Sequence, residues 1–201
     1  MENSFHPIRL QGDHCTLVPL SFEHHDELIE AVTDGELDKL WYALVPEPTK
    51  MKENIRMRLN RQQQGIMIPF AVIDRLTKKA IGMTSYWNID RENRRVEIGG
   101  TWYRKSAQRT GINTECKLLL LTHAFEMMNC IAVEFRTHAF NYRSRQGIER
   151  LGAKLDGIIR NHMIMPNGTL RDTFVYSIIS NEWATVKAHL EFLKNKYLTN
   201  G

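Results

Sequence analysis

The spacing of apolar residues switches along the chain between a helical period and a strand period, which predicts a mixture of helices and strands. Helical spacing is clearest between Leu118 and Met128, where the apolar residues fall on one face. Further helices are predicted after Ser21, at residues 49–64 with Thr49 as the capping residue, at residues 141–151 and from residue 183 onward.

Strand-length apolar segments alternate with these helices. Strands are predicted at residues 8–19, 67–74, 80–88, 96–103 and 132–137. Two further strands are predicted around residues 166–169, one before and one after them. A chain of 201 residues with 42% apolar residues can bury a sizeable core. No repeat, low-complexity tract or flexible linker divides it, so the pattern predicts one α/β (α+β) domain over residues 1–201.

A short polar loop with a central glycine joins the strand at 96–103 to the helix expected from about residue 114. Its residues are Gln108, Arg109, Thr110, Gly111, Ile112 and Asn113. The first N–H groups of a helix lack partners within it and lie at the positive end of its dipole. Gly111 can bring the backbone close to a ligand or adopt a positive φ. The loop is therefore a candidate anion site, although an ordinary connection to a core helix fits the spacing equally well.

Charge and cysteine content narrow the function classes. The net charge of +4 includes a cluster of Arg104, Lys105 and Arg109 around the loop, where a polyphosphate ligand would account for it. No long basic run with interleaved aromatic residues is present, so we expect no nucleic acid partner. The three cysteines lack metal-ligand spacing, so no metal is expected. No apolar run reaches the roughly 18 residues that cross a bilayer, so we expect a cytoplasmic protein.

The loop resembles the Gln/Arg-x-x-Gly-x-Gly/Ala motif with which GNAT N-acetyltransferases bind the pyrophosphate of acetyl-CoA. The similarity is greatest to the RimJ/RimL-like branch and continues through residues 133–136, 141–154 and 168–177. Asn113 departs from the motif, which has Gly or Ala there. The resemblance implies a mixed, mostly antiparallel, splayed sheet of about seven strands with helices on both faces. It implies acetyl-CoA as co-substrate, bound by Gln108, Arg109, Thr110, Gly111, Ile112, Asn113, Thr114 and Asn141.

The same resemblance suggests catalytic residues. Many GNAT enzymes protonate the departing thiolate with a tyrosine seven positions after the asparagine, where this chain has Ile148. In the RimL-like branch a serine three positions after it is the proposed acid, which corresponds to Ser144. Both Asn141 and Ser144 also suit a helix start, with Asn141 as N-cap. Gly147 inside this helix suggests close approach of another backbone or of the cofactor.

A glutamate on the strand at 96–103 is the candidate general base. Alternation puts Glu97 on the face opposite Val96 and Ile98, where a solvent-facing role is the alternative. By resemblance, a glutamate on this strand can act as the base, and Glu134 is its rival. Glu115 follows the start of the long helix, where a favourable interaction with the helix dipole explains it.

The expected function is acetyl transfer from acetyl-CoA to a primary amine by direct attack in a ternary complex. Deprotonating an α-amine costs about 1 kcal/mol at pH 7, against roughly 4 to 5 kcal/mol for lysine, so a modest base suits a protein N-terminal α-amine or a weakly basic small-molecule amine. The specificity for the acceptor would be determined by residues 34–64, which include Trp41 and Tyr42, and by the loops near Trp87 and Pro166. We expect a monomer or homodimer without membrane partners. A non-catalytic acyl-CoA sensor or protein-interaction domain of the same fold is the alternative.

Overall fold

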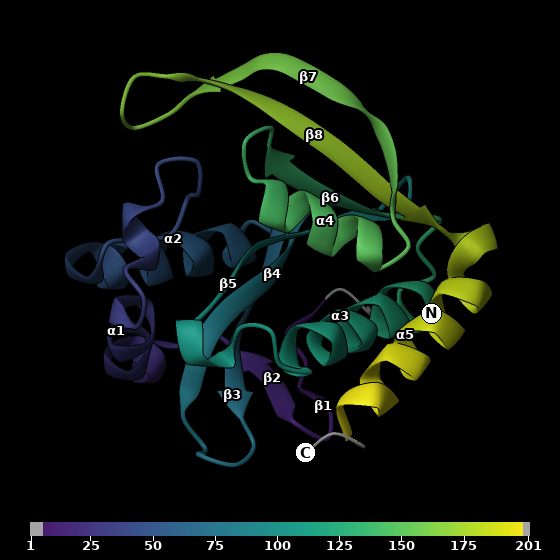
Figure 1. Cartoon of the computed structure of the whole chain (residues 1–201), viewed down its shortest axis with the longest axis horizontal. Helices are drawn as coiled ribbons and strands as arrows, with labels where there is room; N and C mark the ends of the chain where they lie inside the picture. Colours follow the sequence, from purple (N-terminus) through teal and green to yellow (C-terminus); the bar gives the residue numbers. More distant parts are fainter. Residues whose placement is uncertain (1–5, 199–201) are drawn as a thin grey trace.

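The computed structural model describes residues 6–198 and is built around one eight-stranded sheet (Figure 1). The strands are β1 (Leu10–Gln11), β2 (Cys15–Pro19), β3 (Met67–Asp74), β4 (Ala80–Asp90), β5 (Arg95–Tyr103), β6 (Ala132–His138), β7 (Lys154–Ile164) and β8 (Leu170–Ile179). The α-helices are α1 (His25–Thr33), α2 (Met51–Gln63), α3 (Ile112–Thr122), α4 (Tyr142–Arg150) and α5 (Trp183–Leu198). The strand order is β1-β2-β3-β4-β5-β6-β8-β7, and every neighbouring pair is antiparallel except β5 and β6.

This architecture confirms the predicted mixed, mostly antiparallel α/β class, with eight strands instead of about seven. The extra strand arises because residues 8–19 do not form one strand. The Gly12 N–H donates to the Cys15 carbonyl over 2.9 Å and turns the chain between β1 and β2. The strands predicted at 67–74 and 80–88 form the β3–β4 hairpin. Its turn is held by the Asp74 carboxylate, which accepts from the backbone N–H of Leu76 over 2.7 Å.

Helices cover both faces of the sheet. In Figure 1 α1 and α2 lie together on one side of the molecule, and α3 and α5 lie on the other. The core under α1 and α2 includes Leu28, Ile55, Met83 and Trp102. The core under α3, α4 and α5 includes Val96, Ile98, Leu120, Phe135, Ile148 and Leu190. The two opposite faces of β5 therefore belong to different layers, and a β5 side chain faces one layer or the other.

The sheet splays at its centre because β5 and β6 pair for only three residues. The pairs are Arg95–Ala132, Val96–Val133 and Glu97–Glu134. Beyond them β5 continues to Tyr103 and β6 continues to His138 without pairing to each other. The parallel strands therefore diverge, as the resemblance implied.

A β-bulge interrupts β5 in the diverging part. The β4–β5 register shifts between Met83 and Ser85, and Gly100 has a φ of 58°. A Cβ atom at Gly100 would come within 2.9 Å of Arg58 Nη2 and of Trp87 Nε1. Both the backbone angle and the close neighbours therefore favour glycine at this position.

Two helix boundaries differ from the prediction. Thr49 does not cap α2, because it lies inside a 3₁₀ turn, Pro48–Lys50, that begins with proline and leads into Met51. The helix after the glycine loop begins at Ile112, two residues earlier than predicted, and continues beyond Thr122 as a π-helical turn, His123–Met127. Cys130 lies beyond the end of this helix.

Candidate active site

The glycine loop leads directly into the N-terminus of α3. Gly111 is the N-cap residue, but its φ is −64°, so the predicted use of a positive φ at this glycine is wrong. The left-handed backbone lies two residues earlier, at Arg109, with φ 63°. The Thr110 hydroxyl donates to the Ala107 carbonyl over 2.7 Å and accepts the Ile112 N–H at 3.3 Å. The loop is thus shaped by its own short-range hydrogen bonds.

Two backbone donors at this N-terminus are left for a ligand. Within residues 6–198, the N–H groups of Asn113 and Thr114 have no protein acceptor, and Gly111 provides no side-chain cap. Unpaired N–H groups together with the positive end of the helix dipole fit an anion. This observation supports a diphosphate at the loop more directly than the motif does.

Glu115 has a role that the sequence did not reveal. Its carboxylate is 1% exposed and accepts three backbone N–H groups, from Asp13 at 2.7 Å, His14 at 2.8 Å and Cys15 at 2.9 Å. Glu115 lies in the first turn of α3, as predicted, but these three hydrogen bonds add a role that the dipole interaction does not include. Glu115 fastens the first turn of α3 to the β1–β2 turn, which fixes the position of the loop.

Several loop side chains are already engaged within the protein. Gln108 donates to the Tyr103 carbonyl over 3.0 Å and accepts from Arg143 of α4 at 3.2 Å. The Thr114 hydroxyl is fully buried and accepts from Arg150 at 3.1 Å. Arg109 is exposed and can reach a ligand. Of the predicted contacts, Thr114 is thus better placed to use its backbone N–H than its side chain. The backbone N–H of Gln108 is also engaged, because it donates to the Lys105 carbonyl over 3.0 Å.

The start of α4 carries the second group of predicted residues. The Asn141 side-chain oxygen accepts the Ser144 N–H at 3.1 Å, so Asn141 is an N-cap. Ser144 is half-buried, and its hydroxyl makes no hydrogen bond with the part of the chain that is described. A methyl group at Gly147 would meet no atom within 4 Å, so the predicted close approach of another backbone is wrong.

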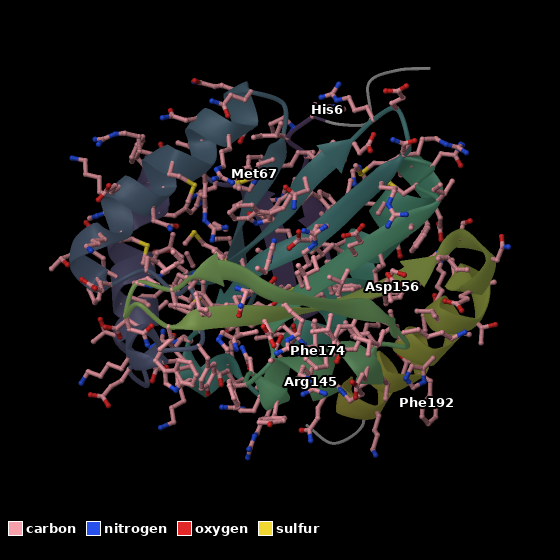
Figure 2. The ribbon with its side chains drawn as sticks, turned by 90° about the horizontal axis from the view of Figure 1, so that it is seen from above. His6, Met67, Arg145, Asp156, Phe174 and Phe192 are labelled. Carbon is pink, nitrogen blue, oxygen red and sulfur yellow. The ribbon has the colours of Figure 1, made fainter. Side chains whose placement is uncertain are left out.

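An arginine fixes α4 against the sheet. In Figure 2 the labelled Arg145 of α4 lies beside the labelled Phe174 of β8, and the guanidinium carbon is 3.9 Å from the ring centroid. Arg145 also donates to the Ala139 carbonyl over 3.2 Å. Arg145 thus attaches α4, which carries Ser144 and the Asn141 N-cap, both to β8 and to the loop before the helix.

The two candidate carboxylates line one cavity of about 180 Å³ on the face opposite α3. Its lining residues are Asn88, Asp90, Arg95, Val96, Glu97, Glu134 and Arg136. Glu97 accepts from Asn88 Nδ2 at 2.8 Å and lies 3.6 Å from Arg136 Nε. Glu134 lies within 2.9 Å of Arg136 and 2.6 Å of Arg95. A larger hollow of about 310 Å³ lies beside α5 and contains neither carboxylate.

These contacts shift the pKa values of the two carboxylates in opposite directions. Burial raises the pKa of Glu97, and the nearby Arg136 and Asn88 only partly oppose this. Burial would also raise the pKa of Glu134, but hydrogen bonds from Arg95 and Arg136 lower it overall. A carboxylate that serves as a proton acceptor near neutral pH needs a raised pKa, and Glu97 meets this condition better than Glu134.

The predicted base and acid lie on opposite sides of the splay. Val96 and Ile98 face the core under α3, so Glu97 faces the other layer. Ser144 is on α4, whose Ile148 packs in the α3 core. The two groups thus flank the line where β5 and β6 diverge.

An aromatic cluster borders the Glu97 face. The Trp41 ring lies 5.2 Å from His138 and 5.8 Å from Phe140, measured between ring centroids. Trp41 is 47% exposed and Phe140 is 56% exposed, so these two rings form a surface beside the buried His138. The cluster joins the α1–α2 connection to the end of β6, and no local sequence pattern predicts the contact between these two segments.

Two buried cations were also missed. Lys117 on α3 and Arg58 on α2 are 6% and 2% exposed. The signal that could have found Lys117 is its place in the apolar run 116–121, three positions before Leu120 and thus on the buried face of the helix. No group of three or more His, Cys, Asp or Glu residues within 6–198 could hold a metal ion, and no helix in that range could span a membrane.

Comparison with known proteins assigns this arrangement to a family. Residues 14–154 match the family described as Acetyltransferase (GNAT) domain, and the chain belongs to that family. The predicted GNAT family is confirmed.

Relatives and solved structures agree with this. Over 102 residues the chain is 35% identical to "Putative ribosomal N-acetyltransferase YdaF" of Bacillus subtilis (strain 168), an alignment that covers 51% of this chain and 55% of that relative. A GCN5-related N-acetyltransferase from Brucella melitensis has a TM-score of 0.83 and 25% identity, over 94% of this chain and 86% of that one. Mycobacterium smegmatis RimJ in complex with CoA-disulfide shares the fold, with a TM-score of 0.77 and 17% identity over 94% and 93% of the two chains.

Proposed function

We propose that this protein transfers an acetyl group from acetyl-CoA to a primary amine by direct attack of the amine. The main support for the proposal is that the N–H groups of Asn113 and Thr114, at the N-terminus of α3, have no acceptor within the described chain. Glu115 anchors this helix next to the point where β5 and β6 diverge. An anion site and a gap between diverging strands are what a diphosphate-bearing acyl donor with a long neutral arm requires. We further propose that residues 1–201 form a single domain of this family.

Within the loop residues 108–114, the N–H groups of Asn113 and Thr114 would hold the diphosphate, with Arg109 contributing its charge. The Asn141 side-chain oxygen is used by the N-cap, so only the amide nitrogen of that side chain would contact the acyl donor. RimJ, which shares the fold, has been solved with CoA-disulfide, and this supports a coenzyme A ligand for the present chain.

Glu97 would accept the proton that the attacking amine loses. The amine nitrogen bonds to the acetyl carbon, the carbon–sulfur bond breaks, one proton leaves the nitrogen and one proton joins the sulfur. Because a carboxylate with a modestly raised pKa is a weak base, Glu97 suits an α-amine of pKa about 8 better than a lysine amine of pKa about 10.4.

Ser144 would assist the departing sulfur from the opposite side of the sheet. A thiol with a pKa near 8.5 leaves as an anion that is only modestly unstable at neutral pH, so a donor there is helpful but not essential. We expect Ser144→Ala to lower kcat by less than tenfold.

The acceptor would approach the face that carries Glu97 and the cluster of Trp41, His138 and Phe140. Aromatic side chains suit an extended apolar or peptide-like acceptor better than a small, strongly charged amine. The name of YdaF refers to ribosomal acetylation, which makes the N-terminus of a ribosomal protein the first acceptor to test.

A non-catalytic acyl-CoA sensor remains the alternative, because Ile148 cannot donate a proton and Asn113 departs from the loop motif. The deciding experiment mixes the protein with acetyl-CoA and a panel of N-terminal peptides and small amines, and measures thiol release. Turnover on a peptide α-amine supports the enzyme. Tight binding of coenzyme A without turnover on any amine would establish the sensor.

A further inference from the structure

Lys117 buries an ammonium group in the α3 layer without a counter-charge. Its Nζ donates to Thr101 Oγ1 over 2.9 Å and lies 6.0 Å from the centroid of the Phe135 ring. No carboxylate of residues 6–198 lies within ion-pair distance of it. An ammonium has three donors, and only one is used here.

The position of this ammonium is between the two diverging strands. Thr101 lies on β5, four residues beyond the last residue that pairs with β6, and Phe135 follows the last paired residue of β6. Along α3, Lys117 is six residues after Gly111, a rise of about 9 Å. The ammonium therefore lies deeper than the diphosphate site, at the gap that the arm of the acyl donor would enter.

A second uncompensated cation meets the same segment of β5 from the other face. Arg58 donates to Ser85 Oγ over 2.8 Å and to the Gly100 carbonyl over 3.2 Å, and like Lys117 it contacts no carboxylate of the described chain. Gly100 and Thr101 are consecutive residues of the β-bulge. Two buried cations thus hold one short segment without any neutralising anion.

Such an arrangement destabilises the fold unless a ligand supplies the missing negative charge. Desolvation disfavours a buried charge, and a charge without a partner is destabilising. Burial lowers the pKa of Lys117 to about 8. A role in packing alone would be met better by leucine or methionine, so the ammonium indicates negative charge that arrives with the substrate or develops during the reaction.

We propose that Lys117 is a catalytic residue that donates a hydrogen bond to the thioester carbonyl oxygen of the bound acyl donor and stabilises the negative charge that grows there. The proposal rests on the acetyl transfer proposed above. The pantetheine arm is neutral, so beyond the phosphates only the thioester oxygen and the sulfur acquire negative charge in this gap. Arg58 acts through the Gly100 carbonyl and is a positioning residue for the bulge that carries Thr101.

The first test uses the wild-type protein. Acetyl-CoA labelled with ¹³C at the acetyl carbonyl is bound, and its resonance is followed as the pH is raised through about 8. A hydrogen bond from the ammonium moves the resonance downfield, and this shift disappears as Lys117 loses its proton. A carbonyl resonance that does not change over this range would overturn the proposal.

Other titratable groups near Lys117 do not mimic this response. Cys116 is its neighbour on α3 and contacts the Cys15 thiol, with 3.2 Å between the sulfur atoms. The hydrogen bond with Cys116 and burial raise the pKa of Cys15, and burial raises that of Tyr103, so both stay neutral through this range. Glu97 and Glu134 face the opposite side of the sheet, away from the α3 layer that contains Lys117.

The second test compares Lys117→Met with Lys78→Met, which alters an exposed lysine in the β3–β4 turn. Lys117→Met should abolish the pH-dependent carbonyl shift and lower kcat about 100-fold, while coenzyme A binding measured by calorimetry changes less than threefold. Lys78→Met should change none of these. A Lys117→Met protein with normal kcat would contradict the proposal. Wild-type protein that does not bind acetyl-CoA would instead refute the proposed function.

Discussion

At the scale of single residues, similar side chains differ in function because their partners differ. Glu97 and Glu134 are paired in register on adjacent strands and line the same cavity. Two arginines within 2.9 Å hold Glu134 as an ion, whereas Glu97 has one amide at 2.8 Å and a more distant arginine. The sequence predicted both as candidates, and only the three-dimensional contacts distinguish them.

We expect Glu97→Gln to lower kcat/KM about 100-fold or more at neutral pH, because the amide cannot accept the proton of the amine. Wild-type activity should fall as the pH drops through the raised pKa of Glu97, since the protonated carboxyl is inactive. The difference between wild type and variant should therefore shrink at low pH. Steady-state rates across pH measure this. A larger loss in Glu134→Gln than in Glu97→Gln would show that the base is assigned to the wrong carboxylate.

Lys117 should reduce stability while it supports catalysis. Its pKa falls from 10.5 to about 8 on folding, so the unfolded chain binds the proton more tightly. This costs stability below about pH 8, and the cost vanishes as the pH rises above 10.5. Lys117→Met should therefore raise the free energy of unfolding by on the order of 3 kcal/mol at pH 7. Urea denaturation at pH 7 checks this, and a variant less stable than wild type would contradict the account.

At the scale of elements, local signals predicted more than distant contacts did. The N-cap at Asn141 and the turn at Asp74 depend on residues within three positions, so the sequence reveals them. The hydrogen bonds of Glu115 were missed because its three partners are about 100 residues away in the chain. For Lys117 the apolar run 116–121 could have indicated burial, but its acceptor Thr101 lies on another element and could not be predicted.

Glu115→Ala tests how α3 is anchored. The change leaves three backbone N–H groups of the β1–β2 turn, one buried and two partly buried, without an acceptor, and it should lower the free energy of unfolding by about 3 to 5 kcal/mol. Chemical denaturation measures this loss. The matched control is Glu92→Ala at an exposed turn, which should change stability by less than about 0.5 kcal/mol. Equal stability of the two variants would mean that Glu115 does not anchor the helix.

At the scale of the whole molecule, the divergence of β5 and β6 determines on which face of the sheet each candidate site residue lies. The fold class and the family follow from apolar periodicity and the resemblance of the glycine loop. The divergence after Glu97 and Glu134 depends on how two strands of different direction and length meet, which periodicity does not encode. That divergence puts the loop, Lys117 and Ser144 in the α3 layer and Glu97 with the aromatic cluster on the opposite face.

The most direct test of the account is an amide ¹H–¹⁵N NMR titration of the protein with coenzyme A and, separately, with pantetheine, which lacks the diphosphate. The account predicts that coenzyme A shifts the N–H resonances of Asn113 and Thr114 most strongly, because these two donors have no acceptor within the described chain. Pantetheine should leave both in place. Saturation with coenzyme A that leaves the Asn113 and Thr114 resonances unchanged would contradict the account.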